Sequence, residues 1–239
     1  MKILLSRTEE ENRRSAERIA ALGFEPVSLP LGKFIETDNP IQWENCDGII
    51  LTSSAVVAIL KQRGISLPKQ IRFYVCGERT AQDLKEAGIS EAEIVCETAG
   101  ALAGKLVAKF FGTKARLLYL AGRDRAFDFT EAFAGTGIFL ELTEVYSVER
   151  IDPGKKVIQA ALEEACGGVQ LHYSAASATF FFELIKKYGL QTASKTMSAV
   201  AISQKTALAV DNLLVKSVKN AKIPTQDGML EILRQFSGR

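Results

Sequence analysis

The chain has 239 residues, 47% hydrophobic and 24% charged, with a formal net charge of +2 at pH 7. This length suits one large domain or two domains of about 100–120 residues each. The small net charge gives no reason to expect nucleic acid as a partner, and no apolar run approaches the roughly 18–20 residues of a membrane span. The first residues continue directly into a helix pattern instead of forming a secretory signal, so we expect a cytoplasmic protein.

Short apolar runs alternate with helix-forming stretches along the chain. Strand 2–5 and helix 9–22 come first, and the extended segment 25–31 carries two prolines, which suit an edge strand that becomes a linker. The later predicted strands are 48–51, 73–76, 93–96, 116–120, 139–150, 169–174, 198–202 and 215–221. The later predicted helices are 55–60, 78–87, 101–111, 126–133, 155–165, 175–184, 204–214 and 227–236. This alternation predicts an α/β fold with parallel sheets covered by helices on both faces.

The few cysteines and the single histidine limit which redox, metal and histidine-based catalytic sites the chain can form. The four cysteines form no C-x-x-C pair, and buried, reduced thiols are the favoured interpretation of Cys46, Cys76, Cys96 and Cys166. The only histidine, His172, lies in an apolar strand pattern, which favours a core position over a catalytic one. Structural zinc sites usually need clustered Cys and His ligands, and the chain has none, so we predict no metal site.

One stretch, DGIILTSSAVVAIL at 47–60, predicts a buried strand, a hydroxyl-bearing turn and a helix that starts at that turn. A helix start offers free N–H groups and a partial positive charge, so it can hold an anion. The same arrangement recurs at 169–184, and 75–81 resembles 201–207, so we expect two similar α/β units. Ligands of open parallel sheets bind beyond the carboxyl ends of the strands, where we place the hydroxyls of Ser53, Thr80, Ser174 and Thr206.

Each of these polar residues also has a structural interpretation. Serine and threonine commonly cap helices, and only their repetition at matching strand ends favours ligand contact. Gly77 permits close backbone approach to a ligand. Guanidinium groups suit carboxylates, but a solvated surface role is the ordinary fate of arginines such as Arg7, Arg79, Arg123 and Arg125. Tyr146, in an extended segment between the two units, is either structural or a proton donor.

Several common enzyme motifs are missing. The chain has no G-x-x-x-x-G-K-[ST] phosphate loop, no strand–GxGxxG–helix fingerprint and no G-x-S-x-G elbow. The sequence therefore gives no motif evidence for a nucleotide-dependent transferase, a nicotinamide enzyme or a hydrolase of these types.

The ordered motifs of the chain resemble those of the uroporphyrinogen-III synthases. The matching segments are KILLSR at 2–7, DGIILTSSAV at 47–56, VCGERTA at 75–81, VY at 145–146, YSAAS at 173–177 and AISQKTA at 201–207. The resemblance implies two similar α/β domains, each a parallel sheet flanked by helices, joined by a two-stranded linker with a cleft between them. The implied domains are 1–33 plus 151–239, which is discontinuous, and 36–146, with linkers at about 28–36 and 143–151.

The resemblance also implies a reaction. Family members are cofactor-independent lyases of tetrapyrrole and heme biosynthesis that cyclise hydroxymethylbilane, with loss of water and inversion of ring D, to uroporphyrinogen III. By matching position, Tyr146 is the expected catalytic residue, assisting departure of the hydroxyl. The polycarboxylate substrate is expected to contact Arg7, Ser53, Ser54, Gly77, Thr80, Arg123, Ser174 and Thr206. We expect no metal, nucleic-acid or membrane partner, and a monomer.

Some positions depart from the family pattern. Ser203 stands where glycine is usual, His172-Tyr173-Ser174 stands where Phe-Thr-Ser is common, and Thr8 stands where proline is frequent. The second unit's pocket and the contact of Thr206 are the parts that these departures affect. The alternative function is a two-lobed cytoplasmic protein that binds an acidic small molecule without catalysis.

Overall fold

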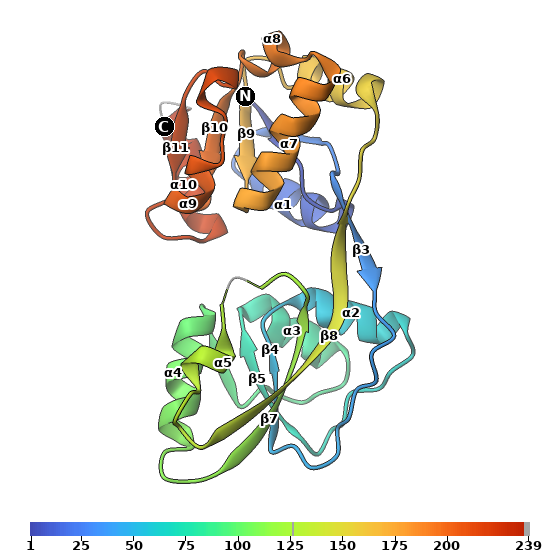
Figure 1. Cartoon of the computed structure of the whole chain (residues 1–239), viewed down its shortest axis with the longest axis vertical. Coiled ribbons are helices and arrows are strands. Elements are labelled where there is room, and N and C mark those ends of the chain that lie inside the picture. Colours follow the sequence, from blue (N-terminus) through green and yellow to red (C-terminus); the bar gives the residue numbers. More distant parts are fainter. Residues whose placement is uncertain (126, 237–239) are drawn as a thin grey trace. The chain divides into compact units, whose positions relative to one another are not determined.

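The computed structural model describes residues 1–125 and 127–236, and the chain divides into two compact units (Figure 1). Unit 1 comprises Met1–Lys33 and Glu149–Arg239, and unit 2 comprises Phe34–Val148. The boundaries fall inside two strands, β3 (Gly32–Glu36) and β8 (Ile138–Arg150), which are neighbours in one sheet. Each unit has its own sheet and its own pair of apolar core clusters.

Unit 1 is built on a five-stranded sheet of order β11-β10-β9-β1-β2, in which all the pairings are parallel. Its strands are β1 (Lys2–Leu5), β2 (Glu25–Ser28), β9 (Val169–His172), β10 (Ser198–Ala201) and β11 (Val218–Asn220). Its helices are α1 (Glu9–Ala21), α6 (Lys155–Glu164), α7 (Ala175–Tyr188), α8 (Gln191–Ser194), α9 (Gln204–Leu208), the 3-10 turn η1 (Asn212–Leu214) and α10 (Gln226–Phe236). One core cluster joins the sheet to α6 and α7, and the other joins it to α1 and α10.

Unit 2 is built on a six-stranded sheet of order β3-β8-β7-β4-β5-β6. Its remaining strands are β4 (Gly48–Leu51), β5 (Arg72–Cys76), β6 (Ile94–Cys96) and β7 (Ala115–Gly122). Its helices are α2 (Ser54–Gln62), α3 (Glu78–Glu86), α4 (Ala99–Lys109) and α5 (Phe129–Ala132). One core cluster joins the sheet to α2 and α3, and the other joins it to α4 and α5. The strands from β4 to β8 pair in parallel, so the predicted α/β class with parallel sheets flanked by helices is confirmed.

The two sheets share one strand order once the chain of unit 1 is read from β9. In unit 2 the strands are numbered 1 to 5 along the chain from β4 to β8, and their order across the sheet, β6-β5-β4-β7-β8, is 3-2-1-4-5. In unit 1 the numbering starts at β9, continues through β10 and β11, and ends with β1 and β2. The order across that sheet, β11-β10-β9-β1-β2, is then also 3-2-1-4-5. The units are therefore circular permutations of one topology, with β4 matching β9 and β7 matching β1. This correspondence explains why the segment 47–60 resembles 169–184, because both contain the first strand and first helix of the shared order.

Most predicted elements lie where the sequence places them, and a few predictions are wrong. The helix predicted at 204–214 ends at Leu208, because Asp211 accepts a hydrogen bond from the Leu213 N–H (3.0 Å) and starts the separate turn η1. The helix predicted at 126–133 is only α5, whose cap is Asp128, and Ala126 lies outside the described residues. The strand predicted at 215–221 shortens to β11, and β2 is the edge strand that its Pro26 predicts.

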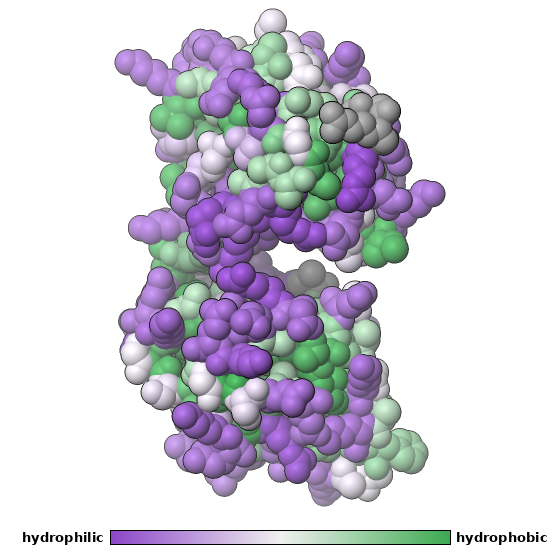
Figure 2. All heavy atoms as spheres, turned by 180° about the vertical axis from the view of Figure 1, so that it is seen from behind, coloured by the Kyte–Doolittle hydropathy of each residue, from purple (hydrophilic) through white to green (hydrophobic). Residues whose placement is uncertain are grey.

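Hydrophilic side chains cover much of the face drawn in Figure 2, over both units. The four core clusters hold the buried apolar side chains, whereas others, such as Phe111 and Leu213, are exposed. No helix of the described residues is long and apolar enough to cross a membrane.

Candidate functional site

The carboxyl ends of parallel strands meet at one edge of each sheet. In unit 2 this edge carries the loops after β4, β5 and β7, together with Tyr146 on β8. The helices α2 and α5, which follow the neighbouring strands β4 and β7, cover opposite faces of the sheet. Such a switch point opens a crevice at the strand ends, where ligands of α/β sheets usually bind.

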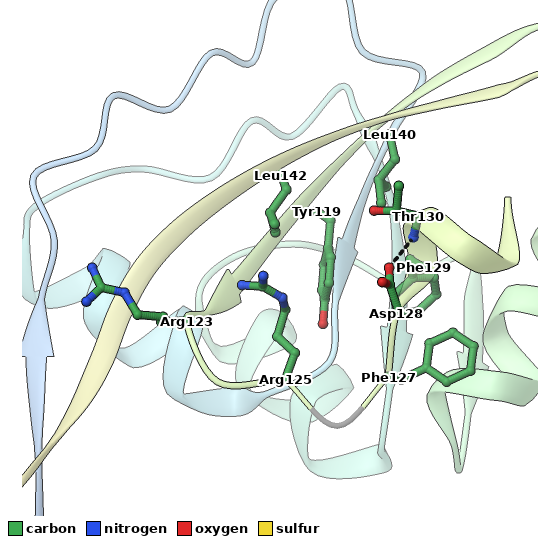
Figure 3. A pocket seen from close by; sticks show the side chains of 9 residues that line it. All are labelled: Tyr119, Arg123, Arg125, Phe127, Asp128, Phe129, Thr130, Leu140 and Leu142. Atoms are coloured by element: carbon green, nitrogen blue, oxygen red, sulfur yellow. Dashed lines mark hydrogen bonds between the residues drawn. The ribbon is translucent and has the colours of Figure 1, made fainter. Parts of the chain in front are cut away.

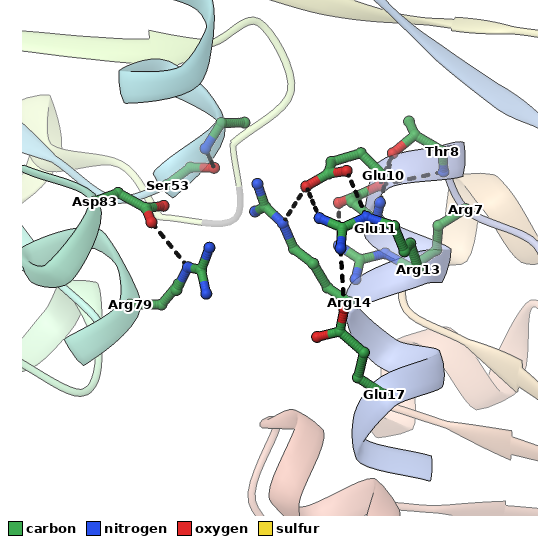
Figure 4. Close-up of polar contacts among 11 residues, drawn as sticks. Arg7, Thr8, Glu10, Glu11, Arg13, Arg14, Glu17, Ser53, Arg79 and Asp83 are labelled. Atoms are coloured by element: carbon green, nitrogen blue, oxygen red, sulfur yellow. Dashed lines mark hydrogen bonds and ion pairs between the residues drawn. The ribbon is translucent and has the colours of Figure 1, made fainter. Parts of the chain in front are cut away.

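The loop after β4 holds Ser53 at the N-cap of α2. The Ser53 hydroxyl accepts a hydrogen bond from the Ala55 N–H (3.2 Å, Figure 4), and Ser54 is the first helical residue, buried at 8% exposure. Directly before them, the Thr52 hydroxyl is 2.8 Å from the phenol oxygen of Tyr119 on β7. The cap therefore leaves Ser53 half-buried at the switch point, with a hydroxyl hydrogen that can donate to an anion.

The loop after β5 places backbone instead of a hydroxyl at the edge. Gly77 has φ +87°, a conformation that favours glycine, and its N–H donates to the Cys96 carbonyl (2.7 Å). The helix α3 starts here without a side-chain cap, so its first N–H groups are the polar groups that this loop offers. Thr80 is 3% exposed and packs in the first turn, so its hydroxyl is less accessible than the Gly77 backbone.

Tyr146 lies opposite the end of β7 because of a bulge. Ala121 pairs with Glu144 and Gly122 pairs with Tyr146, so Val145 is the extra residue of β8. The phenol ring covers Gly122 so closely that a Cβ there would lie 2.5 Å from the ring. Phe34 packs edge-on against the ring, with 5.1 Å between the centroids. The half-buried phenol is thus fixed beside the strand-end loop that carries Arg123.

Two arginines of that loop share one carboxylate. Nε of Arg123 lies 3.2 Å from one oxygen of Glu144, and Nη1 of Arg125 lies 3.0 Å from the other. Arg125 also donates to the Gly122 carbonyl (2.9 Å), and the Arg123 N–H donates to the Tyr146 carbonyl (2.8 Å). The hydrogen bonds from Arg125 and Arg123 hold the pKa of Glu144 below its usual value, so Glu144 stays ionised at neutral pH.

A cavity of about 320 Å³ opens beside this cluster (Figure 3). Its lining combines the two arginines with aromatic and aliphatic side chains, and comprises Tyr119, Arg123, Arg125, Phe127, Asp128, Phe129, Thr130, Leu140 and Leu142. Burial raises the pKa of Tyr119, so that its phenol stays protonated. A cavity that combines aromatic and aliphatic side chains with two arginines suits a small acidic ligand.

In unit 1 the matching edge carries Arg7 after β1 and Ser174 after β9. The Arg7 guanidinium is ion-paired with Glu11 and lies 4.3 Å from the centroid of the Tyr173 ring. Ser174 caps α7, accepting a hydrogen bond from the Ser177 N–H (3.1 Å). The two residues thus occupy the switch point of unit 1, as Arg123 and Ser53 do in unit 2.

The loop after β10 differs from its counterpart after β5. Ser203 caps α9 through the Thr206 N–H (3.2 Å), and the Ser203 and Thr206 hydroxyls are 3.1 Å apart. Thr206 itself is 3% exposed. The first turn of α9 therefore has a side-chain cap, whereas α3 begins at Gly77 without one. Because the cap occupies one N–H of α9, this loop offers an anion fewer free N–H groups than its counterpart in unit 2.

The surface of α1 carries a network of charges (Figure 4). Arg13 is ion-paired with Glu10 and Glu17 (both 2.9 Å), and Arg14 is ion-paired with Glu10 (2.8 Å). In unit 2, Arg79 likewise pairs with Asp83 on its own helix (2.9 Å) and stays 65% exposed. These pairs fit the solvated role that most arginines have.

The structure places His172 in the core, as its apolar strand pattern predicts. His172 is fully buried and packs against the rings of Phe181 and Phe182, and burial lowers its pKa to about 4. Within 1–125 and 127–236, no group of three or more His, Cys, Asp or Glu side chains is placed to hold a metal ion.

Sequence reasoning does not assign Tyr119, Arg125 and Glu144 to the site. Arg125 stands two residues after Arg123 in a strand-end loop, and Glu144 stands two residues before Tyr146. Those spacings are a usable signal, but only the pairing of β7 with β8 brings the three side chains together.

The chain is similar to known proteins in both sequence pattern and fold. A family model described as "Uroporphyrinogen-III synthase HemD" matches residues 13–231. A uroporphyrinogen-III synthetase from Helicobacter pylori shares the fold with a TM-score of 0.66 at 17% identity, covering 98% of each chain. A mutant uroporphyrinogen III synthase from Thermus thermophilus has a TM-score of 0.51 at 17% identity, covering 100% of each chain. No curated protein sequence matches significantly.

The two solved structures establish only the fold, because their identity to this chain is low. The family model carries the stronger statement, since it spans nearly the whole sequence and both units. The chain belongs to the uroporphyrinogen-III synthase family.

Proposed function

We propose that the chain cyclises hydroxymethylbilane to uroporphyrinogen III, with loss of water and inversion of ring D. The match of the family model to residues 13–231 is the observation that carries this function. The strand-end groups agree with a polycarboxylate substrate, because arginines and helix starts gather at the carboxyl edge of each sheet.

The geometry favours orientation over strong acid–base chemistry. The linear substrate cyclises readily without the enzyme, but without inversion, so the enzyme's main task is to hold the chain in the shape that inverts the last ring. The first N–H groups of α3, directly after Gly77, and the hydroxyl of Ser53 are suited to binding side-chain carboxylates. The Ser174 hydroxyl can bind one in exchange for its bond to Ser177. Arg7 and Arg123 supply positive charge beside them.

Tyr146 is the proposed proton donor. The leaving hydroxyl departs as water once its oxygen receives a proton, and a phenol can supply that proton. The contacts of Tyr146 with Gly122 and Phe34 support this role, because they hold the ring in one orientation beside the Arg123 loop. Ser54, Thr80 and Thr206 are proposed as substrate neighbours whose buried side chains support the strand-end loops. The N–H groups of Thr80 and Thr206 already donate to the Gly77 carbonyl (3.0 Å) and the Ser203 hydroxyl (3.2 Å).

The isomer of the product tests the function. Purified protein given hydroxymethylbilane should yield the inverted isomer, resolved from the non-inverted one by chromatography after oxidation. Formation of only the non-inverted isomer would contradict the proposal. Tight binding of the product without turnover would instead favour the binding-protein alternative. The predicted monomer and cytoplasmic location stay predictions.

The role of Tyr146 is tested by one variant and its matched control. Tyr146→Phe should slow ring closure by about 10-fold or more, the low end of a general-acid contribution. Tyr188→Phe also removes one phenol hydroxyl, which is bonded to Asp152 on the surface of unit 1 (2.8 Å), and should leave the rate unchanged. An unaltered rate in Tyr146→Phe removes Tyr146 from the mechanism.

A further inference from the structure

The cavity of unit 2 has walls that suit a flat ring. Tyr119 and Phe129 pack edge-to-face with 5.0 Å between their centroids, and Phe127 packs against Phe129 in the same way at 4.9 Å. Leu140 and Leu142 of β8 complete the apolar part of the lining, while polar atoms make up the larger part of its accessible surface. Aromatic faces and edges of this kind pack well against another aromatic ring.

The cavity is held in shape by hydrogen bonds of its lining residues. The Tyr119 phenol is 2.8 Å from the Thr52 hydroxyl. Asp128 accepts from the Thr130 N–H (2.8 Å) and from the Glu131 N–H (3.3 Å), which fixes the start of α5 (Figure 3). A site whose walls are already ordered loses less conformational entropy when a ligand binds.

The size of the cavity selects the size of the ligand. Its volume of about 320 Å³ lies at the lower end of the usual range for small-molecule sites, about 300–1,000 Å³. It suits one substituted five-membered ring and not a whole chain of four.

The charges beside the cavity are balanced by an internal carboxylate. Arg125 is 27% exposed and Arg123 is 63% exposed, and both bind Glu144, which is 26% exposed. In Figure 3 the Arg125 guanidinium lies beside Tyr119 and Leu142, whereas the Arg123 guanidinium points away from the aromatic residues. Arg125 is therefore the cation that a ligand in the cavity meets, and Glu144 is the group that such a ligand's carboxylate must displace.

We propose that this cavity binds a single pyrrole ring of the substrate, whose carboxylate side chain replaces Glu144 on Arg125. The inference rests on the proposed function, since it names where one ring of that substrate lies. Glu144 is a positioning residue: it holds Arg125 in place before the ligand arrives and competes with the ligand's carboxylate. Arg123 keeps its bond to Glu144 after the exchange, so the displaced carboxylate is not left unpaired.

The proposal is tested first with a probe of the right size. A monopyrrole with one acetate and one propionate side chain should bind the wild-type chain at millimolar concentration or below, with NMR shifts in the amides of β7 and β8. Its diester should not bind. Arg125→Gln should weaken binding by about 10- to 100-fold, the loss of a charge-assisted hydrogen bond, and Glu144→Gln should strengthen it by about 3-fold or more.

A matched control separates this cavity from general surface charge. Arg72, at the opposite end of β5, is 62% exposed and also pairs with a glutamate, Glu93 (3.3 Å). Arg72→Gln should bind the probe as the wild type does. Failure of the wild type to bind the monopyrrole would overturn the proposal, as would equal binding by Arg125→Gln, or weaker binding by Glu144→Gln.

Kinetics with the full substrate distinguish this inference from the proposed function. Arg125→Gln should raise KM by about 10-fold while kcat changes by less than about 3-fold, because uniform binding is lost. Glu144→Gln should lower KM. If the wild type makes only the non-inverted isomer, the proposed function fails. The titration with the monopyrrole still shows whether the cavity binds a single pyrrole ring. If the wild type is active and KM is the same in all variants, the cavity assignment alone fails.

Discussion

The position of Tyr146 depends on the absence of a side chain at Gly122. The ring occupies the space that a Cβ there would fill, and the bulge at Val145 places Tyr146 opposite Gly122. A residue with no direct part in chemistry thus decides where the proposed proton donor lies. The same reasoning applies to any residue that approaches Tyr146 this closely.

Replacement of Gly122 by alanine should therefore displace the phenol. The new Cβ would lie 2.5 Å from Cε2 and 2.6 Å from Cζ of Tyr146, so the ring must move. We expect Gly122→Ala to reduce kcat by about as much as Tyr146→Phe does, about 10-fold. Gly104→Ala on α4, where no atom lies within 4 Å of the added Cβ, should keep full activity. Steady-state kinetics of the wild type, Gly122→Ala and Gly104→Ala measure the effect. A wild-type kcat in Gly122→Ala would contradict this account.

His172 shows the opposite case, a titratable residue whose place is in the core. Nε2 of His172 lies 3.0 Å from Oε1 of Gln170, and Nδ1 has no hydrogen-bond partner among the described residues. A proton on Nδ1 would add a buried charge without an acceptor, which is why burial lowers the pKa of His172 to about 4.

This pKa predicts acid sensitivity of the fold. The unfolded chain takes up a proton near pH 6.5 but the folded chain does so only near pH 4, so stability is complete above pH 6.5 and falls as the pH drops toward 4. At pH 5 the loss should be about 2 kcal/mol relative to pH 7.5. Urea unfolding of the wild type and of His172→Gln at both pH values measures it. The variant should lose much less stability, and an equal loss in both proteins would exclude His172 as the cause.

At the scale of elements, the helices of the site loops differ in how they begin. Serine caps α2, α7 and α9, whereas α3 begins at Gly77 without a side-chain cap. The capping serine Ser53 has two separable tasks, because its oxygen accepts from the helix while its hydrogen remains available to a ligand. The Ser174 hydroxyl differs, because it donates to the Ser177 hydroxyl (2.8 Å).

Two substitutions of Ser53 should separate these tasks. Ser53→Ala should destabilise the protein by about 1 kcal/mol, and Ser53→Gly by only a few tenths, because glycine is tolerated at N-caps. Both remove the hydroxyl, so both should raise KM for the substrate by a similar factor if Ser53 contacts it. Thermal unfolding and steady-state kinetics give the two readouts. A KM that follows stability and not the hydroxyl would assign Ser53 to capping alone.

The sequence predicts elements well wherever local signals agree. The buried strand β4 is a continuous apolar run, and helix ends coincide with glycines such as Gly23 and Gly189, both at positive φ. It predicts poorly where a local contact overrides the pattern: the apolar spacing of 204–214 continues past Leu208, but Asp211 starts a new turn there. The sequence indicates β3 only as a linker, because its partner β8 lies more than a hundred residues later.

The candidate site is predictable in part for the same reason. Ser53, Gly77 and Ser174 follow apolar runs directly, and their places at strand ends agree with the prediction. The burial of Thr80 and Thr206 is not visible in the sequence, since a helix's first turn exposes one face and hides the other. Nor can spacing reveal that Glu144 binds both Arg123 and Arg125, which depends on the register of β7 against β8.

The whole molecule repeats one topology in two permuted forms. Unit 2 is a single continuous segment, Phe34–Val148, inserted between two parts of unit 1. Within unit 1 the two connection points are close, because the Ile151 N–H donates to the Leu31 carbonyl (3.0 Å). Within unit 2, the Thr37 N–H similarly donates to the Val145 carbonyl (3.1 Å). Each unit therefore holds its own ends together.

A separately expressed unit 2 should fold. Residues 34–148 contain complete core clusters on both faces of their sheet, so we expect a single cooperative thermal transition and native-like circular dichroism. The fragment 149–239 lacks β1, which neighbours β9, and β2 beyond it, so it should remain largely unfolded. Proteolysis resistance of the two fragments provides the comparison. The absence of a cooperative transition in 34–148 would show that the insertion is not an independent folding unit. A cooperative transition in 149–239 would show that this part of unit 1 folds without β1 and β2.

The permuted order of unit 1 has a consequence for the timing of synthesis. The central strands of unit 2, β4, β5 and β7, leave the ribosome within one stretch of chain, and its sheet can assemble while translation continues. The first strand to emerge, β1, has its partner β9 more than a hundred and sixty residues behind it. The edge of β1 that faces β9 must wait longest for its neighbour. The early residues Ile19 and Phe24 can already cover part of Ile3 and Leu5, but the cluster is complete only when β9 arrives. Slow translation after residue 150 should thus extend the time in which the nascent N-terminal segment is open to chaperones or to aggregation.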